Sequence, residues 1–294
     1  MIAKLLSSKY TRSKVRKALP EDYAYIIDEL LHAQEDEDAN QIRYHKQILQ
    51  TIIELEDADE FIIALSQLIK RLAVDHLHIV GDIFDRGPCA DRIMDLLTTY
   101  HSIDIEWGNH DILWMGAAAG SRACIATVIR NNLKYDNMKI MENSYGISLR
   151  NLTLFAEKIY PQIDPMEAAL KAISVLLFKL EGQVILRNPD YKMEDKLLLH
   201  KVDVKRQVVE IGGKEYKIKK EEFPTVSFAA ESVEEVYQLT EEEENVMEGL
   251  QMAFVNSIRL RQHIDFLYKK GSMNPKYRFE MPEEKGIGEV RFFA

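Results

Sequence analysis

Hydrophobic positions in the first seventy residues repeat with the spacing of a helix. Apolar side chains recur three or four residues apart within residues 26–31, 48–55 and 61–72. This spacing places them on one face of each helix, where they can be buried together. We therefore predict a helical N-terminal segment over residues 1–72.

The pattern changes in the next part of the chain. The run LHIV at residues 77–80 is short and apolar and ends at a glycine, which is typical of a buried strand. A helical pattern follows over residues 92–100, and IDIEW at residues 103–107 is the next predicted strand. Strand, helix and strand make a βαβ unit, so we predict the α/β fold class with its core over residues 73–150.

Helical periodicity returns over residues 151–273, with a short interruption. The runs KLLLHKVDV, QVVEI and EYKIK have strand character, and Gly212-Gly213 between the last two is typical of a hairpin turn. We predict a mainly helical insertion that carries a β-hairpin near residues 197–219. Residues 274–294 are rich in proline, glycine and charge, so we predict an irregular tail.

The insertion is predicted to end in one long helix. Thr240 is a suitable N-cap, and Glu243 three residues later completes a capping box. Two lysines precede Gly271, as is usual at a helix C-terminus. We therefore expect a continuous helix between Thr240 and Gly271.

Composition narrows the classes of protein and partner. The 294 residues are 46% hydrophobic and 29% charged, which is typical of a globular protein. The net charge of −10 argues against binding to nucleic acid or to an anionic membrane, and the N-terminus lacks the apolar core of a signal peptide. The two cysteines make no disulfide framework, so we predict a cytoplasmic location.

Charge is unevenly distributed near the N-terminus. The first twenty residues carry six Lys or Arg and no acid, whereas residues 21–60 carry thirteen acids and two bases. Two interpretations stay open: solvated helix faces, or an anion-binding site formed by four basic side chains. Those four are Arg12, Lys14, Arg16 and Lys17.

Two polar stretches directly follow the two predicted strands. HIVGDIFDRGP contains Asp82, and EWGNHD contains Asn109. Ligands of open α/β sheets bind at the carboxyl ends of strands, and carboxylate and amide oxygens suit Mn²⁺ and Mg²⁺. Both side chains can therefore contribute to a two-metal phosphoesterase site, which binds phosphate and activates water.

Three neighbouring residues have the chemistry that such a site needs. Arg86 can bind phosphate oxygens with its planar fork. His110 can protonate a leaving alkoxide, and Asp85 can orient its ring and keep it charged. Either stretch alone could be an ordinary turn with glycines and capping aspartates, but their order on consecutive strand ends favours phosphoester chemistry.

These stretches resemble a known family. GDIFDRG and GNHD look like the second and third motifs of the phosphoprotein-phosphatase type of calcineurin-like metallophosphatases. The flanking SSKYTRSKVRKALP, RLAVDHLHIVGDIFDRGP and WGNHDILWMGAAAGS resemble class III fructose-1,6-bisphosphatases, the Mn²⁺-dependent type of many Firmicutes. FKLEGQVILRNP, EEFPTVSFA and HIDFLYKKGSM extend the resemblance, which covers about residues 7–274.

The resemblance implies roles for these residues. Asp82 would bridge both metal ions, Asn109 would ligate the second, and Arg86 would contact phosphate. His110 would be the general acid, paired with Asp85. The implied reaction is hydrolysis of the 1-phosphate of fructose 1,6-bisphosphate in gluconeogenesis, on a partial calcineurin-like sheet.

The sequence departs from the family pattern at the other metal ligands. That pattern has an upstream Asp-x-His-Gly motif and two later histidines, but no Asp-x-His occurs here. His200 and His263 are the only histidines after His110, and we expect both to be structural or surface residues. We therefore expect a chain cut at both ends and without activity by itself.

Several alternatives stay open at this point. The chain can be a gene-model fragment, a frameshifted remnant or a genuine short protein. It can be a fructose-bisphosphatase that works alone, as a homo-oligomer or with a complementing chain, or an inactive or regulatory remnant of that family. Another metallophosphatase, acting on proteins or dinucleotide polyphosphates, is a further alternative.

Overall fold

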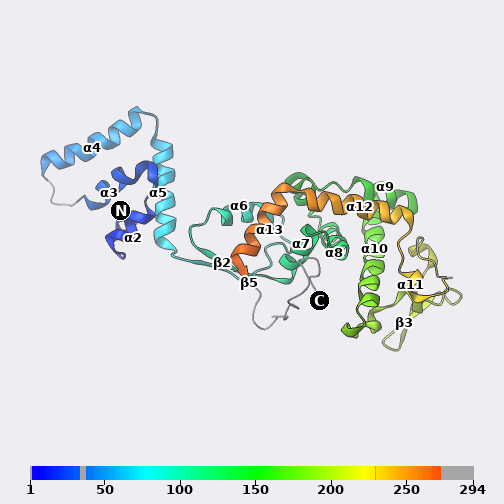
Figure 1. Ribbon diagram of the computed structural model, residues 1–294. Helices are drawn as coiled ribbons and strands as arrows, with labels where there is room; N and C mark the ends of the chain where they lie inside the picture. The colour runs from blue at the N-terminus through cyan, green and yellow to red at the C-terminus, as the bar shows by residue number, and fades with distance from the viewer. Residues whose placement is uncertain (1, 34–37, 229, 273–294) are drawn as a thin grey trace. The chain divides into compact units, whose positions relative to one another are not determined.

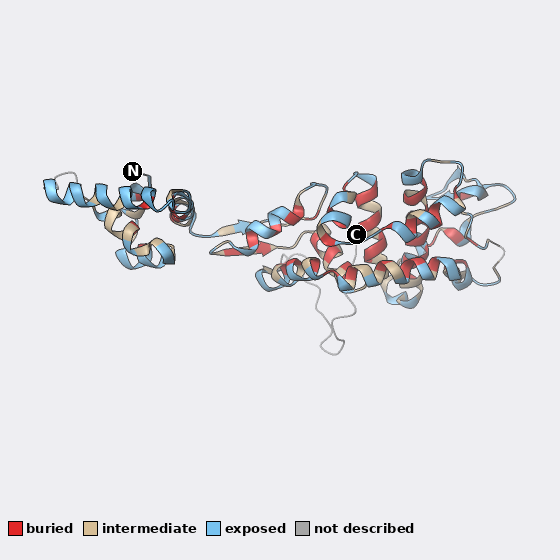
Figure 2. Ribbon diagram, turned by 90° about the horizontal axis from the view of Figure 1, so that it is seen from above, coloured by how far each residue is buried: buried red, intermediate tan, exposed pale blue. Residues whose placement is uncertain are grey.

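A computed structural model describes residues 2–33, 38–228 and 230–272 (Figure 1). Most of the described chain is helical, and the longer helices carry buried residues on one face and exposed residues on another (Figure 2). None of the described helices is long and apolar enough to cross a membrane. The predicted irregular tail, residues 274–294, lies outside the described residues.

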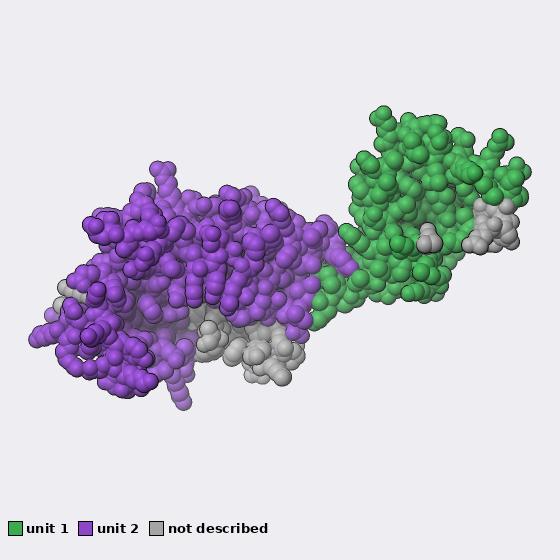
Figure 3. Space-filling model, turned by 180° about the vertical axis from the view of Figure 1, so that it is seen from behind, with its two compact units in different colours: residues 1–78, 101–104 green, residues 79–100, 105–294 purple. Residues whose placement is uncertain are grey.

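The chain forms two compact units (Figure 3). Unit 1 contains residues 1–78 and 101–104, and unit 2 contains residues 79–100 and those from 105 onward. The predicted division into segments 1–72, 73–150 and 151–273 stays a prediction.

Unit 1 is helical, as its periodicity predicts. Short polar side chains start two of its helices: Thr11 accepts a hydrogen bond from the amide of Lys14, and Asp38 forms a capping box with Gln41. The helices are α1 (Ile2–Ser7), α2 (Arg12–Ala18), the 3₁₀ turn η1 (Glu21–Tyr23), α3 (Ala24–His32), α4 (Ala39–Glu54) and α5 (Ala58–Ala73).

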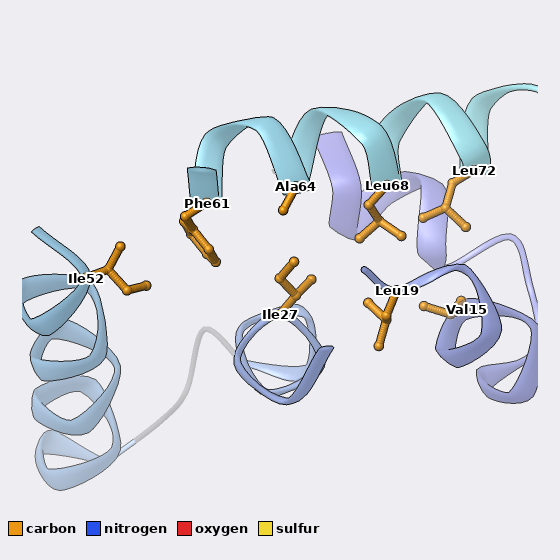
Figure 4. Packing of buried hydrophobic residues seen from close by; sticks show 8 residues of the cluster. All are labelled: Val15, Leu19, Ile27, Ile52, Phe61, Ala64, Leu68 and Leu72. Carbon is orange, nitrogen blue, oxygen red and sulfur yellow. The ribbon is translucent and has the colours of Figure 1, made fainter. Parts of the chain in front are cut away.

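The core of unit 1 gathers around one face of α5 (Figure 4). Figure 4 shows four side chains spaced three or four residues apart that point from α5 toward residues of the preceding helices. On α5 they are Phe61, Ala64, Leu68 and Leu72, and they face Val15, Leu19, Ile27 and Ile52. Burial of this apolar surface is what stabilises helices that are individually short.

Both predicted strands are present. β1 (Leu77–Ile79) and β2 (Ile103–Glu106) form a three-stranded sheet with β5 (Gly271–Ser272), in the order β1-β2-β5. β5 pairs in parallel with β2, so that Ile105 lies opposite Gly271. The α/β prediction is thus confirmed in a coarse form, with many helices and a small sheet, while the calcineurin-like assignment stays a prediction.

Unit 2 is built mainly from helices. Its longest helix, α10, starts at Pro165 behind the N-cap Asp164 and packs against α8 and α9. The helices are α6 (Ala90–Thr98), α7 (Asn109–Ala118), α8 (Arg122–Lys134), the π-helix η2 (Ile140–Ser144), α9 (Arg150–Ile159), α10 (Pro165–Arg187), α11 (Val233–Val236), α12 (Glu241–Asn256) and α13 (Ile258–Lys270). Four short 3₁₀ turns are η3 (Pro189–Tyr191), η4 (Glu194–Lys196), η5 (Leu199–Lys201) and η6 (Lys220–Glu222).

The predicted hairpin is confirmed within the insertion. β3 (Val208–Ile211) pairs antiparallel with β4 (Lys214–Lys217). Gly212 and Gly213 between them have φ of 57° and 76°, a conformation that favours glycine and matches the twist of a tight hairpin. The strand predicted for KLLLHKVDV is wrong for most of its length, because η4 and η5 turn this stretch and Leu197 and Leu199 enter a core cluster with Tyr237. Asp203 near its end forms an isolated antiparallel bridge with Val208.

The predicted continuous helix after Thr240 is also wrong. The capping box of Thr240 and Glu243 is present, but the chain breaks at Ser257 into α12 and α13. Ser257 has an extended ψ of 104°, its hydroxyl donates to the Tyr145 carbonyl at 2.6 Å, and it accepts from the amide of Leu260. A hydrogen bond to a distant segment, which periodicity cannot reveal, therefore ends one helix and starts the next.

Candidate functional site

The loops after β1 and β2 meet backbone to backbone. A Cβ atom on Gly81 would lie 2.5 Å from the backbone nitrogen of Gly108, and one on Gly108 would lie 2.5 Å from the backbone nitrogen of Asp82. Gly81 also has φ of 91°. Glycine is required at both positions because any side chain would push the two loops apart.

Asp82 is held at the N-terminus of helix α7. Its Oδ1 accepts a hydrogen bond from the backbone N–H of His110 at 3.1 Å. Its own backbone has φ of 55°, in the left-handed region that residues other than glycine rarely adopt. The carboxylate is exposed, and the free N–H groups and dipole of α7 stabilise negative charge there.

Asp111 connects the two loops through hydrogen bonds. It is not among the site residues predicted from the sequence. Its fully buried carboxylate accepts from the backbone N–H of Asp82 at 2.7 Å, of Phe84 at 3.2 Å and of Gly108 at 3.0 Å. Burial raises the pKa of this carboxyl group, and the three N–H donors oppose that rise. The sequence signal that could have identified Asp111 is its position as an acid three residues after the glycine that caps α7.

Asp85 and His110 lie together, as predicted. The Nε2 atom of His110 is 2.9 Å from Oδ1 of Asp85. Asp85 Oδ1 is buried and has no hydrogen-bond partner among the described residues. The predicted proximity is confirmed, and the catalytic roles of the two residues stay predictions.

Arg86 lies beside the same carboxylate with most of its side chain in solvent. Its Nε is 3.4 Å from Asp85 Oδ1, and its guanidinium group lies over the ring of Tyr135, 4.8 Å from the centroid. Its carbonyl oxygen accepts from the Asn137 side chain at 2.5 Å. The backbone is therefore anchored while the exposed guanidinium group can reach an anion.

Asn109 is the first residue of α7 and is exposed, next to His110 and one residue after the glycine that touches Asp82. Asp82 and Asn109 are both exposed and carry oxygen donors of the kind that divalent cations bind. No group of three or more His, Cys, Asp or Glu side chains arranged for a metal ion occurs among the described residues. These residues fit one side of a metal site.

The basic residues near the N-terminus have acidic neighbours within unit 1. Lys14 Nζ is 2.7 Å from Asp75, and Arg16 is 3.3 Å from Asp28, which Arg12 also approaches at 3.9 Å. Lys17 is exposed on the same helix, α2. The anion-binding interpretation of these four residues stays a prediction.

The two later histidines take part in hydrogen bonds between helices. His263 is buried, with Nε2 3.0 Å from Asp95 and Nδ1 3.1 Å from the Tyr145 hydroxyl. His200 Nδ1 is 3.4 Å from the hydroxyl of Tyr237. These contacts agree with the expectation that both are structural or surface residues.

An α/β unit with acidic, amide and imidazole side chains at neighbouring strand ends is the architecture of a ligand-binding edge. The model of the Firmicute fructose-1,6-bisphosphatase family matches residues 1–280 of this chain. The chain therefore belongs to the Firmicute fructose-1,6-bisphosphatase family.

Curated relatives are similar across most of the chain. A fructose-1,6-bisphosphatase class 3 of Listeria monocytogenes serovar 1/2a is 48% identical over 292 residues, which cover 92% of this chain and 44% of that protein. One from Clostridium beijerinckii is 47% identical and covers 94% of this chain and 44% of its own length. This chain thus spans less than half of the length of these relatives, and no solved structure matches it.

Proposed function

We propose that this chain contributes the phosphate-hydrolysing edge of a fructose-1,6-bisphosphatase, which converts fructose 1,6-bisphosphate to fructose 6-phosphate and phosphate. The observation that supports this most directly is the meeting of the two motif loops, with His110 contacting both Asp82 and Asp85. The sugar is inferred from the names of the relatives.

Asp82 and Asn109 would hold the divalent cation, which we propose to be Mn²⁺. When bound, such a cation draws charge from phosphate oxygens and makes water a better nucleophile. Arg86 would bind the remaining phosphate oxygens, because its guanidinium group is exposed and its backbone is anchored by Asn137.

His110 would protonate the sugar oxygen as the bond from phosphorus to the C1 oxygen breaks. Its Nε2 faces Asp85, so Nδ1 is the nitrogen that would deliver the proton. The Asp85 carboxylate beside Nε2 would orient the ring for this transfer. Arg86 near the same carboxylate reduces the negative charge that would otherwise repel the substrate.

Two ligands cannot neutralise the charge of two divalent ions. We therefore expect negligible hydrolysis by the 294-residue chain alone, even with added Mn²⁺, and activity when a second segment carrying Asp-x-His-Gly and two further histidines is supplied. Phosphate release from fructose 1,6-bisphosphate measures this, with and without the added segment. Mn²⁺-dependent release by the chain alone, abolished by Asp82→Asn, would contradict the expected ligand set.

The general-acid role is tested in the supplemented, active form. His110→Asn should lower kcat by roughly 10²–10⁴-fold and change the Mn²⁺ dissociation constant much less. His32→Asn, an exposed histidine of unit 1, is the matched control and should leave kcat unchanged. Equal kcat for His110→Asn and the control would exclude this role.

The alternative is a non-catalytic remnant or regulatory subunit of the family. That alternative predicts no phosphate release under any supplementation. Failure of the supplemented form, although the chain is folded and the segment is bound, would favour it over the enzyme.

A further inference from the structure

The buried carboxylate of Asp111 has an unusual set of partners. Oδ2 accepts hydrogen bonds from the backbone amides of Asp82 and Gly108, and Oδ1 accepts one from the backbone amide of Phe84. No Lys, Arg or His pairs with it among the described residues. A fully buried carboxylate is normally costly, so its stability here depends on these three backbone donors.

Capping of helix α7 explains only one of these hydrogen bonds. Asp111 is the third residue of α7, and an acid there normally accepts from the N-cap amide, which is that of Gly108. The other two donors belong to the opposite loop, after β1. Asp111 therefore joins the two loops as well as capping the helix.

The loop after β1 contains a residue whose backbone needs support. Asp82 has φ of 55° without being glycine, so surrounding contacts must hold it there. Its backbone N–H donates to Asp111 at 2.7 Å, and its side-chain Oδ1 accepts from the N–H of His110 at 3.1 Å. Two hydrogen bonds, one to the backbone and one to the side chain, thus set the direction of the Asp82 carboxylate. Both form only when the two loops lie against each other.

We propose that Asp111 is a positioning residue for the divalent-cation site: by binding the amides of both loops, it holds the Asp82 carboxylate beside Asn109. This inference rests on the proposed function, because it takes Asp82 and Asn109 as cation ligands. It assigns Asp111 an effect on cation affinity without contact with the cation, which is the usual effect of residues that orient metal ligands.

The test is Asp111→Asn in the full 294-residue chain. Asparagine has the same shape but only one side-chain oxygen, so it cannot accept hydrogen bonds from all three amides. Hydrogen exchange at the amides of Asp82, Phe84, Gly108 and His110 should accelerate at least tenfold, while amides of α8 and α10 exchange as in the wild type. The Mn²⁺ dissociation constant from calorimetric titration should rise about 10–100-fold.

Asp91→Asn is the matched control. Asp91 is also a buried carboxylate of unit 2, but it accepts from Ser144 and Arg259 and contacts neither loop amide. It should leave Mn²⁺ affinity and exchange at the four loop amides unchanged.

Each failure has a distinct meaning. Unchanged loop exchange or unchanged Mn²⁺ affinity in Asp111→Asn would overturn the positioning role, and so would global unfolding of the variant, which would show a general structural role. If loop exchange accelerates but the wild-type chain takes up no Mn²⁺ at millimolar concentration, the proposed cation site itself is wrong and the inference falls with it.

Discussion

Unit 1 and unit 2 bury different kinds of side chain. Among the described residues, every buried residue of unit 1 is apolar, and the basic side chains of its ion pairs, such as Lys14 and Arg16, are exposed. Unit 2 buries eight polar or charged residues as well: Asp91, Asp111, Asn132, Asn137, Lys179, Glu243, Ser257 and His263. Apolar contact needs only area, whereas each buried polar group needs a partner at a defined distance and angle.

This difference in buried polar groups shows which contacts fix one arrangement of helices and loops. In unit 2 Lys179 Nζ lies 2.7 Å from Glu243 and 2.8 Å from the Thr225 carbonyl, so that α10, α12 and a loop are held in one arrangement. Asp111 holds the two motif loops in the same manner. Unit 1 should therefore tolerate exchange of one apolar residue for another, while unit 2 should respond strongly to loss of a single polar partner.

The largest expected effect is at the buried ion pair. Lys179→Met should lower the free energy of unfolding of unit 2 by about 3–5 kcal/mol, because Glu243 is then a buried charge without its cation. Both tryptophans, Trp107 and Trp114, lie in unit 2, so urea unfolding followed by tryptophan fluorescence reports on this unit.

Lys171→Met is the control for this prediction. Lys171 lies on the same helix with an exposed partner, Glu167, at 3.2 Å, and its loss should cost less than about 1 kcal/mol. Equal effects of the two substitutions would contradict the contrast between a polar interior and a polar surface.

The next effect concerns the apolar interior of unit 1. Leu68→Ala should lower local stability by about 3 kcal/mol, because Leu68 is fully buried and its removal leaves a cavity. Hydrogen exchange of peptides from α5 measures this. Leu68→Met should cost much less, and Ile62→Ala, which is exposed on the same helix, should be nearly neutral. A large cost for Leu68→Met would show that the core of unit 1 is as specific as that of unit 2.

The next effect concerns pH: acid should lower the stability of unit 2 at a higher pH than that of unit 1. Burial lowers the pKa of His263 and of His200, both in unit 2. The unfolded chain then binds protons more readily than the folded unit, so stability falls as pH drops through the ordinary histidine pKa of about 6.5. In unit 1, hydrogen bonds from Lys14 lower the pKa of Asp75, and that contribution is lost only under much more acidic conditions.

The urea midpoint by tryptophan fluorescence should therefore be lower at pH 5.5 than at pH 7.5. His200→Gln, which cannot be protonated, should reduce this difference. The same midpoint at both pH values would show that the two histidines do not control the acid sensitivity of unit 2.

The smallest effect is expected at the surface of unit 1. Arg16→Ala should cost less than about 1 kcal/mol, because the Arg16 side chain is mostly exposed and Arg12 also approaches its partner Asp28. Chemical denaturation in low and high salt measures this, and the wild type and variant should converge at 1 M salt. A cost similar to that of Leu68→Ala would mean that unit 1 also depends on specific polar pairs.

The sequence predicted those parts of the fold that depend on local pattern. Periodicity located the helices of unit 1, the short apolar runs located β1 and β2, and the glycine pair located the hairpin. It also placed Asp85 within reach of His110 through the order of the motifs on strand ends. The break at Ser257 escaped prediction, because it depends on a carbonyl group 112 residues away.

Local spacing and the chemistry of residue types therefore determined which elements form and which side chains can take part in the proposed hydrolysis. Tertiary structure decided which polar groups meet in the interior: Asp111 with amides of two loops, Lys179 with Glu243, and β5 with β2. The reason is that apolar burial follows from a repeat along the chain, whereas a buried polar group is stable only when folding brings a distant partner to it.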